Sequence, residues 1–73
     1  RGILLESCLQ KMIQLDQYNE EYIYLLMTYY AEEGNAKRMI KIYEEYYRNM
    51  KEELGINPSR KIVEFYGEFI KNK

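Results

Sequence analysis

The sequence predicts an all-α domain of about four short helices, and three of its features support this prediction. Apolar residues recur every three or four positions through most of the 73 residues, which is the period of one helix face. Glycines and asparagines, which commonly end and cap helices, separate the apolar stretches. No stretch has the pattern of a strand. A chain of this length forms one small domain with a modest core, so we expect residues 1–73 to be a single domain.

The first two helices are expected at Ile3–Leu15 and Glu20–Glu33. The apolar stripe of the first helix comprises Leu5, Cys8, Leu9, Met12 and Ile13. The second helix follows Asn19, a residue type that caps helix N-termini, and is apolar on two sides. Its two stripes comprise Ile23, Leu26, Met27 and Tyr30, and Tyr22, Leu25 and Tyr29. A helix of this kind is buried between neighbours, so it should contact both the first and the third helix.

The third helix is expected to follow Asn35 and to end at Leu54. Gly34 leaves almost no loop before it, so the second and third helices should form a tight antiparallel hairpin. Gly55 should end the helix in the left-handed conformation, which a residue without Cβ adopts at little cost. The apolar face comprises Met39, Ile40, Tyr43, Tyr46, Tyr47, Met50 and Leu54. On the opposite face, weakly stabilising i, i+4 pairs are expected at Lys41–Glu45, Glu44–Arg48 and Arg48–Glu52.

The fourth helix is expected from Arg60 to about Asn72, with Ser59 as its N-cap. Its apolar stripe comprises Ile62, Phe65, Tyr66, Phe69 and Ile70. Gly67 in the middle costs about 1 kcal/mol relative to alanine, so it either permits the close approach of another helix or marks a weak point. Arg60 and Lys61 are unfavourable at the positive end of the helix dipole, so they are expected either to serve another role or to balance the acidic N-terminal half of the chain.

The composition excludes several functional classes. The formal net charge of −1 argues against a general nucleic-acid-binding surface. With no histidine and one cysteine, a structural zinc site is excluded. No phosphate-binding loop, nucleophile elbow or flanked acid pair is present, so we expect no enzyme activity, no cofactor and no small-molecule substrate.

The expected location is the cytoplasm, without a membrane partner. No apolar run approaches the roughly 20 residues that span a bilayer. Cys8 is expected to be a buried hydrophobic residue in a reducing cytosol.

Nine tyrosines are the compositional outlier. We expect four of them to be core residues whose hydroxyls reach the edge of the fold, namely Tyr30, Tyr43, Tyr46 and Tyr66. Four others cannot all be buried in four helices, and amphipathic rings at a surface are common interface anchors. The candidate protein-interaction residues are therefore Tyr22, Tyr24, Tyr29 and Tyr47.

A helical hairpin that ends in glycine and precedes a longer amphipathic helix resembles the tetratricopeptide repeat (TPR). With Gly34 as the glycine of the repeat, the large apolar positions fall on Ile23, Leu26, Tyr30, Met39, Tyr43 and Tyr46. The usual small residues are replaced by Met27, Met39 and Tyr46, so the match to the generic repeat is partial.

The sequence has a closer resemblance to the bacterial transcriptional activator domain. The matching segments are Tyr18-Asn19-Glu20-Glu21, Leu26-Met27, Tyr43-Glu44, Glu53-Leu54-Gly55-Ile56, Pro58-Ser59 and Tyr66. The resemblance covers nearly all of residues 12–70, and Glu53 to Ser59 is its most specific part. Tyr, Ile, Met and Lys stand where many members of the family carry Ala, Leu and Arg.

This resemblance implies a TPR-like, antiparallel helical array that binds protein. In the family, the domain follows a winged-helix DNA-binding domain in transcription regulators of the antibiotic-regulatory-protein type, so DNA would be bound only through a separate N-terminal domain. The implied roles are self-association, including dimerisation, and contact with the transcription machinery. Two alternatives stay open: a generic TPR-like peptide-binding scaffold unrelated to transcription, and a helical appendage of an enzyme.

Overall fold

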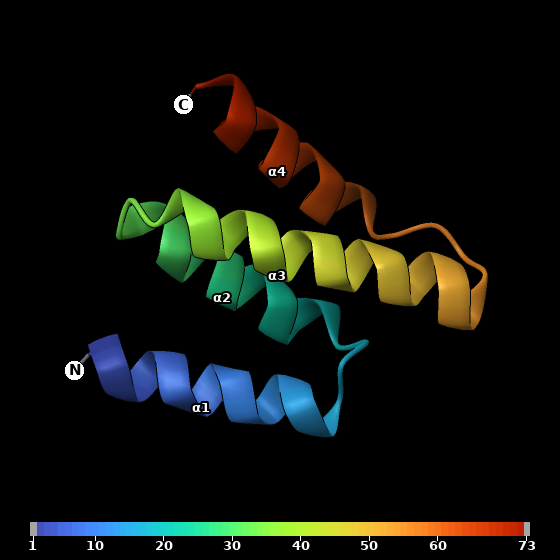
Figure 1. Cartoon of the computed structure of the whole chain (residues 1–73), viewed down its shortest axis with the longest axis horizontal. Helices are drawn as coiled ribbons and strands as arrows, with labels where there is room; N and C mark the ends of the chain where they lie inside the picture. The colour runs from blue at the N-terminus through green and yellow to red at the C-terminus, as the bar shows by residue number, and fades with distance from the viewer. Residues whose placement is uncertain (1, 73) are drawn as a thin grey trace.

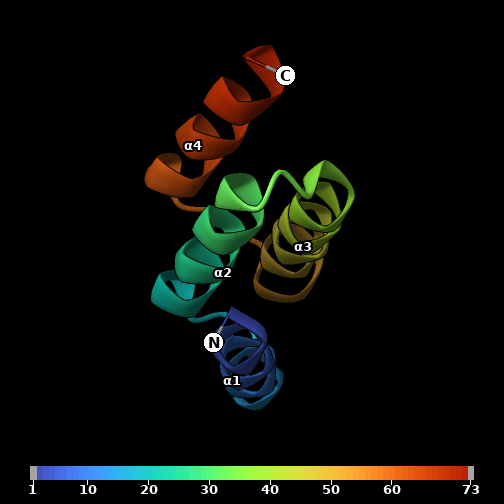
Figure 2. The same ribbon diagram turned by 90° about the vertical axis from the view of Figure 1, so that its left-hand side faces the viewer.

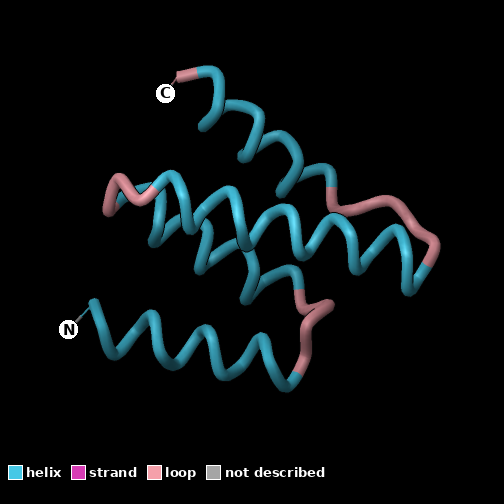
Figure 3. The backbone as a smooth tube through the Cα atoms, viewed as in Figure 1, coloured by secondary structure: helices cyan, strands magenta, loops and turns pink. Residues whose placement is uncertain are grey.

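The chain forms four helices in an antiparallel array (Figure 1). The structure is a computed structural model that describes residues 2–72, so Arg1 and Lys73, the ends of the predicted domain, lie outside the described residues. The elements are α1 (Gly2–Leu15), α2 (Glu20–Glu32), α3 (Ala36–Asn49), the π-helical turn η1 (Met50–Leu54) and α4 (Arg60–Lys71). Short loops join them, and residues 2–72 contain no strand (Figure 3). The predicted all-α fold is confirmed.

α2 is the central helix. It lies between α1 and α4, and α3 packs against its side (Figure 2). The buried residues of α2 are Ile23, Leu26, Met27 and Tyr30, which is the first of the two predicted stripes. The second stripe is only partly covered, because Tyr22 and Tyr29 are half-buried and Leu25 is exposed. None of the helices within residues 2–72 has the length and apolarity to cross a bilayer.

The core is built mainly by α2 and α3. Its buried residues are Leu9, Ile23, Leu26, Met27, Tyr30, Met39, Tyr43, Tyr46, Met50 and Ile62. Each fully buried apolar side chain contributes about 1.5–3 kcal/mol relative to an exposed one. The expected core positions of Tyr30, Tyr43 and Tyr46 are confirmed, whereas Tyr66 is half-buried at the edge of the core.

The prediction that Cys8 is buried is wrong. The side chain of Cys8 is exposed, as is that of Leu5. α1 packs chiefly against a single neighbour, α2, which covers only a narrow strip of the α1 surface. Leu9 is the one buried residue of α1, and Met12 and Ile13 are half-buried beside it.

Two of the three predicted N-caps are formed by side chains. The Oδ1 atom of Asn19 accepts a hydrogen bond from Tyr22 N–H at 3.1 Å, and Oδ1 of Asn35 accepts one from Arg38 N–H at 3.2 Å. Ser59 occupies the N-cap position of α4, but its side chain makes no capping hydrogen bond. The predicted role of the Ser59 side chain is therefore wrong. The backbone N–H of Ser59 donates to the hydroxyl of Tyr46 at 2.8 Å.

The third helix differs from the prediction in its last turn, which is π-helical over Met50–Leu54. Gly55 has φ 66° and ψ 25°, the predicted left-handed conformation, and its N–H donates to the carbonyl of Met50. The N–H of Ile56 donates to the same carbonyl at 3.2 Å. The wider turn therefore lets one carbonyl accept from both residues that follow the helix.

The predicted ion pairs along the polar face of α3 are not formed. Within residues 2–72, the ion pairs are Arg38–Glu6 at 2.6 Å and Arg60–Glu64 at 3.0 Å. Holding two long exposed side chains in one geometry costs conformational entropy that offsets most of the attraction in water. Most charged side chains of α3 therefore stay solvated.

Tyr46 links three parts of the fold. Its side chain is 1% exposed, and its hydroxyl donates to Oε2 of Glu20 at 2.9 Å while it accepts from Ser59 N–H. α3 is thus tied both to the start of α2 and to the residue that precedes α4. Burial is the main cause that raises the pKa of Tyr46 to about 12; the hydrogen bond from Ser59 opposes this rise, and that to Glu20 adds to it.

Replacing Gly55 with valine should lower the free energy of unfolding by about 2 kcal/mol, because a β-branched residue is strained at positive φ. Gly67→Ala is the matched control. An added Cβ at Gly67 meets no atom within 4 Å, so this variant should be about 1 kcal/mol more stable than the wild type. Urea unfolding of the three proteins measures both effects, and unchanged stability of the Gly55 variant would contradict the first.

Replacing Tyr46 with phenylalanine should cost about 1–3 kcal/mol at pH 7, because Ser59 N–H loses its partner. The pKa of Tyr46 is higher in the folded state, about 12, than in the unfolded chain, about 10. The folded protein therefore holds this proton more tightly, so the contribution of Tyr46 is complete below pH 10 and falls as the pH rises toward 12. Urea unfolding at pH 7, 10 and 11 should show the gap between wild type and Tyr46→Phe narrowing; a constant gap would contradict this assignment.

Candidate protein-interaction surface

A cluster of tyrosine rings lies where α3 meets α4. The rings of Tyr43 on α3 and Tyr66 on α4 are stacked, with centroids 3.7 Å apart and planes at 3° to each other. The ring of Tyr47 lies 5.8 Å from that of Tyr43 at an angle of 50°. Tyr43 is buried, but Tyr47 is 40% exposed. We call Tyr43, Tyr47 and Tyr66 the α3–α4 tyrosine cluster; Tyr47 forms its exposed edge.

The side chain of Tyr24, a residue of α2, packs against α4. Its ring meets that of Phe65 in an edge-to-face arrangement, with centroids 5.2 Å apart. The ammonium group of Lys61 sits 4.1 Å from the centroid of the same ring, within the range of a cation–π interaction. Tyr24 is therefore half-buried and engaged within the chain. Lys61 is unfavourable at the positive N-terminal end of α4, and this contact with Tyr24 gives it another role.

Tyr29 lies on α2 beside the beginning of α1. Its ring centroid is 5.7 Å from that of Tyr30, and its hydroxyl would lie 2.9 Å from a Cβ added to Gly2. The absence of a side chain at Gly2 thus permits this close approach. Tyr29 is half-buried, as is Tyr22, which lies seven residues earlier on α2. Partial burial, then the negative charge of Glu33, raises the pKa of Tyr29.

The structure does not gather the four candidate tyrosines into one patch. Tyr24 faces α4, Tyr29 adjoins α1, and Tyr47 belongs to the α3–α4 tyrosine cluster. Among the four, Tyr47 is exposed and the other three are half-buried. Their role in binding a partner stays a prediction, and it is most direct for Tyr47.

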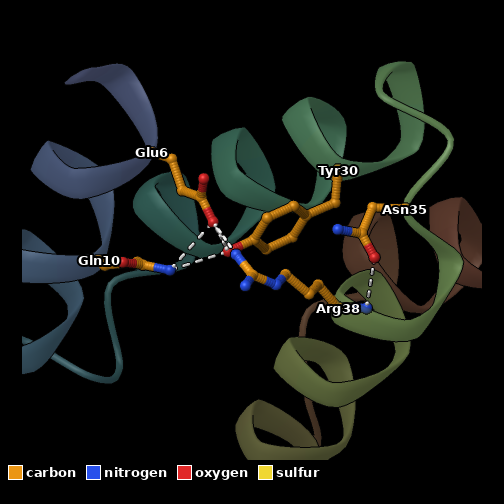
Figure 4. A network of polar contacts seen from close by, with 5 residues as sticks. All are labelled: Glu6, Gln10, Tyr30, Asn35 and Arg38. Carbon is orange, nitrogen blue, oxygen red and sulfur yellow. Dashed lines mark hydrogen bonds and ion pairs between the residues drawn. The ribbon is translucent and has the colours of Figure 1, made fainter. Parts of the chain in front are cut away.

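A polar network joins α1, α2 and α3 (Figure 4). The Oε2 atom of Glu6 accepts hydrogen bonds from Tyr30 Oη at 2.8 Å, Arg38 Nη1 at 2.6 Å and Gln10 Nε2 at 3.3 Å. The Gln10 amide also donates to Tyr30 Oη at 3.0 Å. Burial, and then the hydrogen bond to Glu6, raises the pKa of Tyr30.

The network partners of Tyr30 were not apparent from the sequence. Glu6 and Gln10 lie on the polar side of α1, and Arg38 lies on the polar side of α3. The sequence did indicate that Tyr30 would have some polar partner, because a core tyrosine needs a hydrogen-bond partner for its hydroxyl at the edge of the fold. Which residue supplies this partner depends on the packing of α1 against α2, so spacing within one helix cannot identify it.

Comparison with known proteins gives one match. The family model of the bacterial transcriptional activator domain matches residues 5–69, a range that holds most of α1 and α4 and all of the elements between them. No curated protein and no solved structure matches the chain. The matched range contains the segment Glu53 to Ser59, with the left-handed Gly55 that ends η1. By the extent of this match and by its all-α fold, the chain belongs to the bacterial transcriptional activator domain family.

Proposed function

We propose that the chain is a protein-interaction module of a bacterial transcription regulator. It acts by self-association, including dimerisation, or by contact with the transcription machinery. The family match supports the regulator context. The regulator would act in the cytoplasm and would bind DNA through a separate N-terminal domain, while this module would have no catalytic role.

The observation that carries the interaction role is the geometry of Tyr47. This ring is 40% exposed, yet it rests against Tyr43, which is stacked in turn on Tyr66. A ring held in place before binding loses little conformational freedom when a partner covers it. Tyrosine is also one of the residue types that carry most of the binding energy at interfaces. Tyr47 is therefore the proposed anchor of the contact.

We propose that a surface on α4 also takes part in self-association. Val63, Gly67 and Ile70 follow one another at spacings of four and three, so they share one side of the helix. Val63 and Ile70 are exposed, and an added Cβ at Gly67 would meet no atom within 4 Å. No side chain among residues 2–72 packs closely against Gly67. The surface of α4 at Gly67 is therefore open to the close approach of a partner helix.

Replacing Tyr47 with alanine should weaken self-association at least tenfold, because a truncated aromatic anchor typically costs more than about 1.4 kcal/mol. Leu15→Ala is the matched control, since Leu15 is 84% exposed and lies on α1, away from the α3–α4 tyrosine cluster. Sedimentation from about 10 μM to 1 mM measures the association constants. Helix content measured by circular dichroism should be unchanged in both variants.

Two results would count against the proposal. A wild-type chain that is monomeric at millimolar concentration would remove self-association, and equal association of wild type and Tyr47→Ala would remove Tyr47 as its anchor. The regulator context has a separate test in the sequence encoded before Arg1. A winged-helix domain there supports the proposal, whereas tandem repeats of about 34 residues would favour the generic scaffold.

A further inference from the structure

A trough runs between α1 and α3. The two helices pack against α2 rather than against each other, which leaves an open cavity of about 640 Å³ between them, with Leu26 and Tyr30 of α2 at its base. A second cavity of about 170 Å³ continues the first. The two cavities share the residues Ile13, Gln14, Ile42 and Glu45. We call the joined cavities the α1–α3 trough.

Hydrogen bonds cross the trough at both ends. At one end, Arg38 of α3 binds Glu6 of α1 (Figure 4); the Glu6 side chain is 17% exposed and that of Arg38 is 58% exposed. At the other end, Asn49 Nδ2 donates to Gln17 Oε1 at 3.5 Å, and Gln17 Nε2 donates to Glu53 Oε1 at 3.4 Å. These contacts tie α1 and the turn after it to α3 and η1 at the two ends of the trough.

One wall of the trough is rich in carboxamides. Gln10 and Gln14 of α1 and Gln17 of the turn that follows it line the trough, and the spacing of four residues places Gln10 and Gln14 on one side of the helix. A carboxamide both donates and accepts hydrogen bonds, so it matches the N–H and C=O of a peptide main chain. Gln10 and Gln17 are engaged within the chain. Gln14 is exposed and has no hydrogen-bond partner among residues 2–72, so its amide is free to bind a ligand.

The remaining lining is balanced in charge and apolar at its centre. Arg38 is neutralised by Glu6, and Lys41 and Glu45 contribute one charge of each sign. Half-buried Ile13 and Ile42 face the same space from opposite helices. A binding site for the nucleic-acid backbone would instead need excess positive charge, with exposed aromatic rings for the bases. The lining therefore fits an uncharged ligand with a polar backbone and one apolar group.

We propose that the α1–α3 trough binds a short, uncharged peptide segment in extended conformation. Its main chain would hydrogen-bond to Gln14, and one side chain the size of leucine would pack against Ile13 and Ile42. From Glu6 to Gln14, α1 rises about 12 Å, the length of about four extended residues. None of the four candidate tyrosines lines the trough, so this site is separate from the proposed self-association surface.

Nuclear magnetic resonance titration of the ¹⁵N-labelled chain tests the proposal. The probe is acetyl-Ser-Thr-Leu-Thr-Ser-amide, and the same peptide with glycine in place of leucine is its control. The leucine peptide should shift the backbone signals of Ile13 and Ile42 and the side-chain amide signal of Gln14, with saturation in the millimolar range. The glycine peptide should bind at least fivefold more weakly, because it lacks the apolar group.

A pair of variants tests the residue assignment. Gln14→Ala should weaken binding of the leucine peptide about fivefold, the effect of one hydrogen bond, with little effect on the fold because Gln14 is exposed. Lys11→Ala is the matched control on α1, since Lys11 is exposed and does not line the trough. This variant should bind the peptide as the wild type does.

Several results would overturn the proposal. The first is that about 10 mM leucine peptide shifts none of the resonance signals of the trough residues. The others are equal binding of the leucine and glycine peptides, and equal binding of the leucine peptide by wild type and Gln14→Ala. Oligothymidylate shifting the same signals more strongly than the leucine peptide would identify a nucleic-acid site instead. A failure of this proposal can be distinguished from a failure of the self-association proposal. Self-association is measured without the peptide and is tested by Tyr47→Ala.

Discussion

The burial of α2 against three other helices is the constraint on which the structure depends. Leu26 and Met27 at its centre are fully buried, and these side chains lose their contact with water only because α1, α3 and α4 all pack around one short helix. Apolar burial is the dominant favourable term in folding, and a chain of this size has little of it to lose. The caps at Asn19 and Asn35 fix where α2 and α3 begin, so the apolar residues of the two helices meet in register.

Most of this architecture was predictable from the sequence, because it depends on local chemistry. Helix period, asparagine caps and a left-handed glycine act over a few residues, and each left a readable pattern. The errors occurred where a distant neighbour decides the outcome. Cys8 lies on an apolar stripe, but no second helix among residues 2–72 covers that side of α1. Ser59 has the right chemistry for a cap, yet its side chain makes no capping hydrogen bond, and its contact with α3 is made by its backbone N–H.

In the candidate site, too, local features were predictable from the sequence and contacts between helices were not. Composition indicated that some tyrosines must remain at the surface, and Tyr47 does. Periodicity could not show that Tyr24 is held by Phe65 and Lys61 of another helix. The trough could not be predicted from the sequence either, because it depends on how α1 and α3 pack against α2 without meeting each other. Spacing along α1 places Gln10 and Gln14 on one side of the helix, but only that separation opens a cavity beside them.

The π-helical turn at Met50–Leu54 has a consequence for where this chain can accommodate an added residue. A π turn has i→i+5 hydrogen bonds and so holds one residue more than an α turn does. Here it lies beyond Tyr46 and begins at Met50, so an added residue would leave the upstream core positions of α3 facing α2. The same insertion inside α2 would rotate half of that helix by about 100° and turn its buried side chains away from their neighbours. An added residue is therefore better tolerated at the end of α3 than within α2.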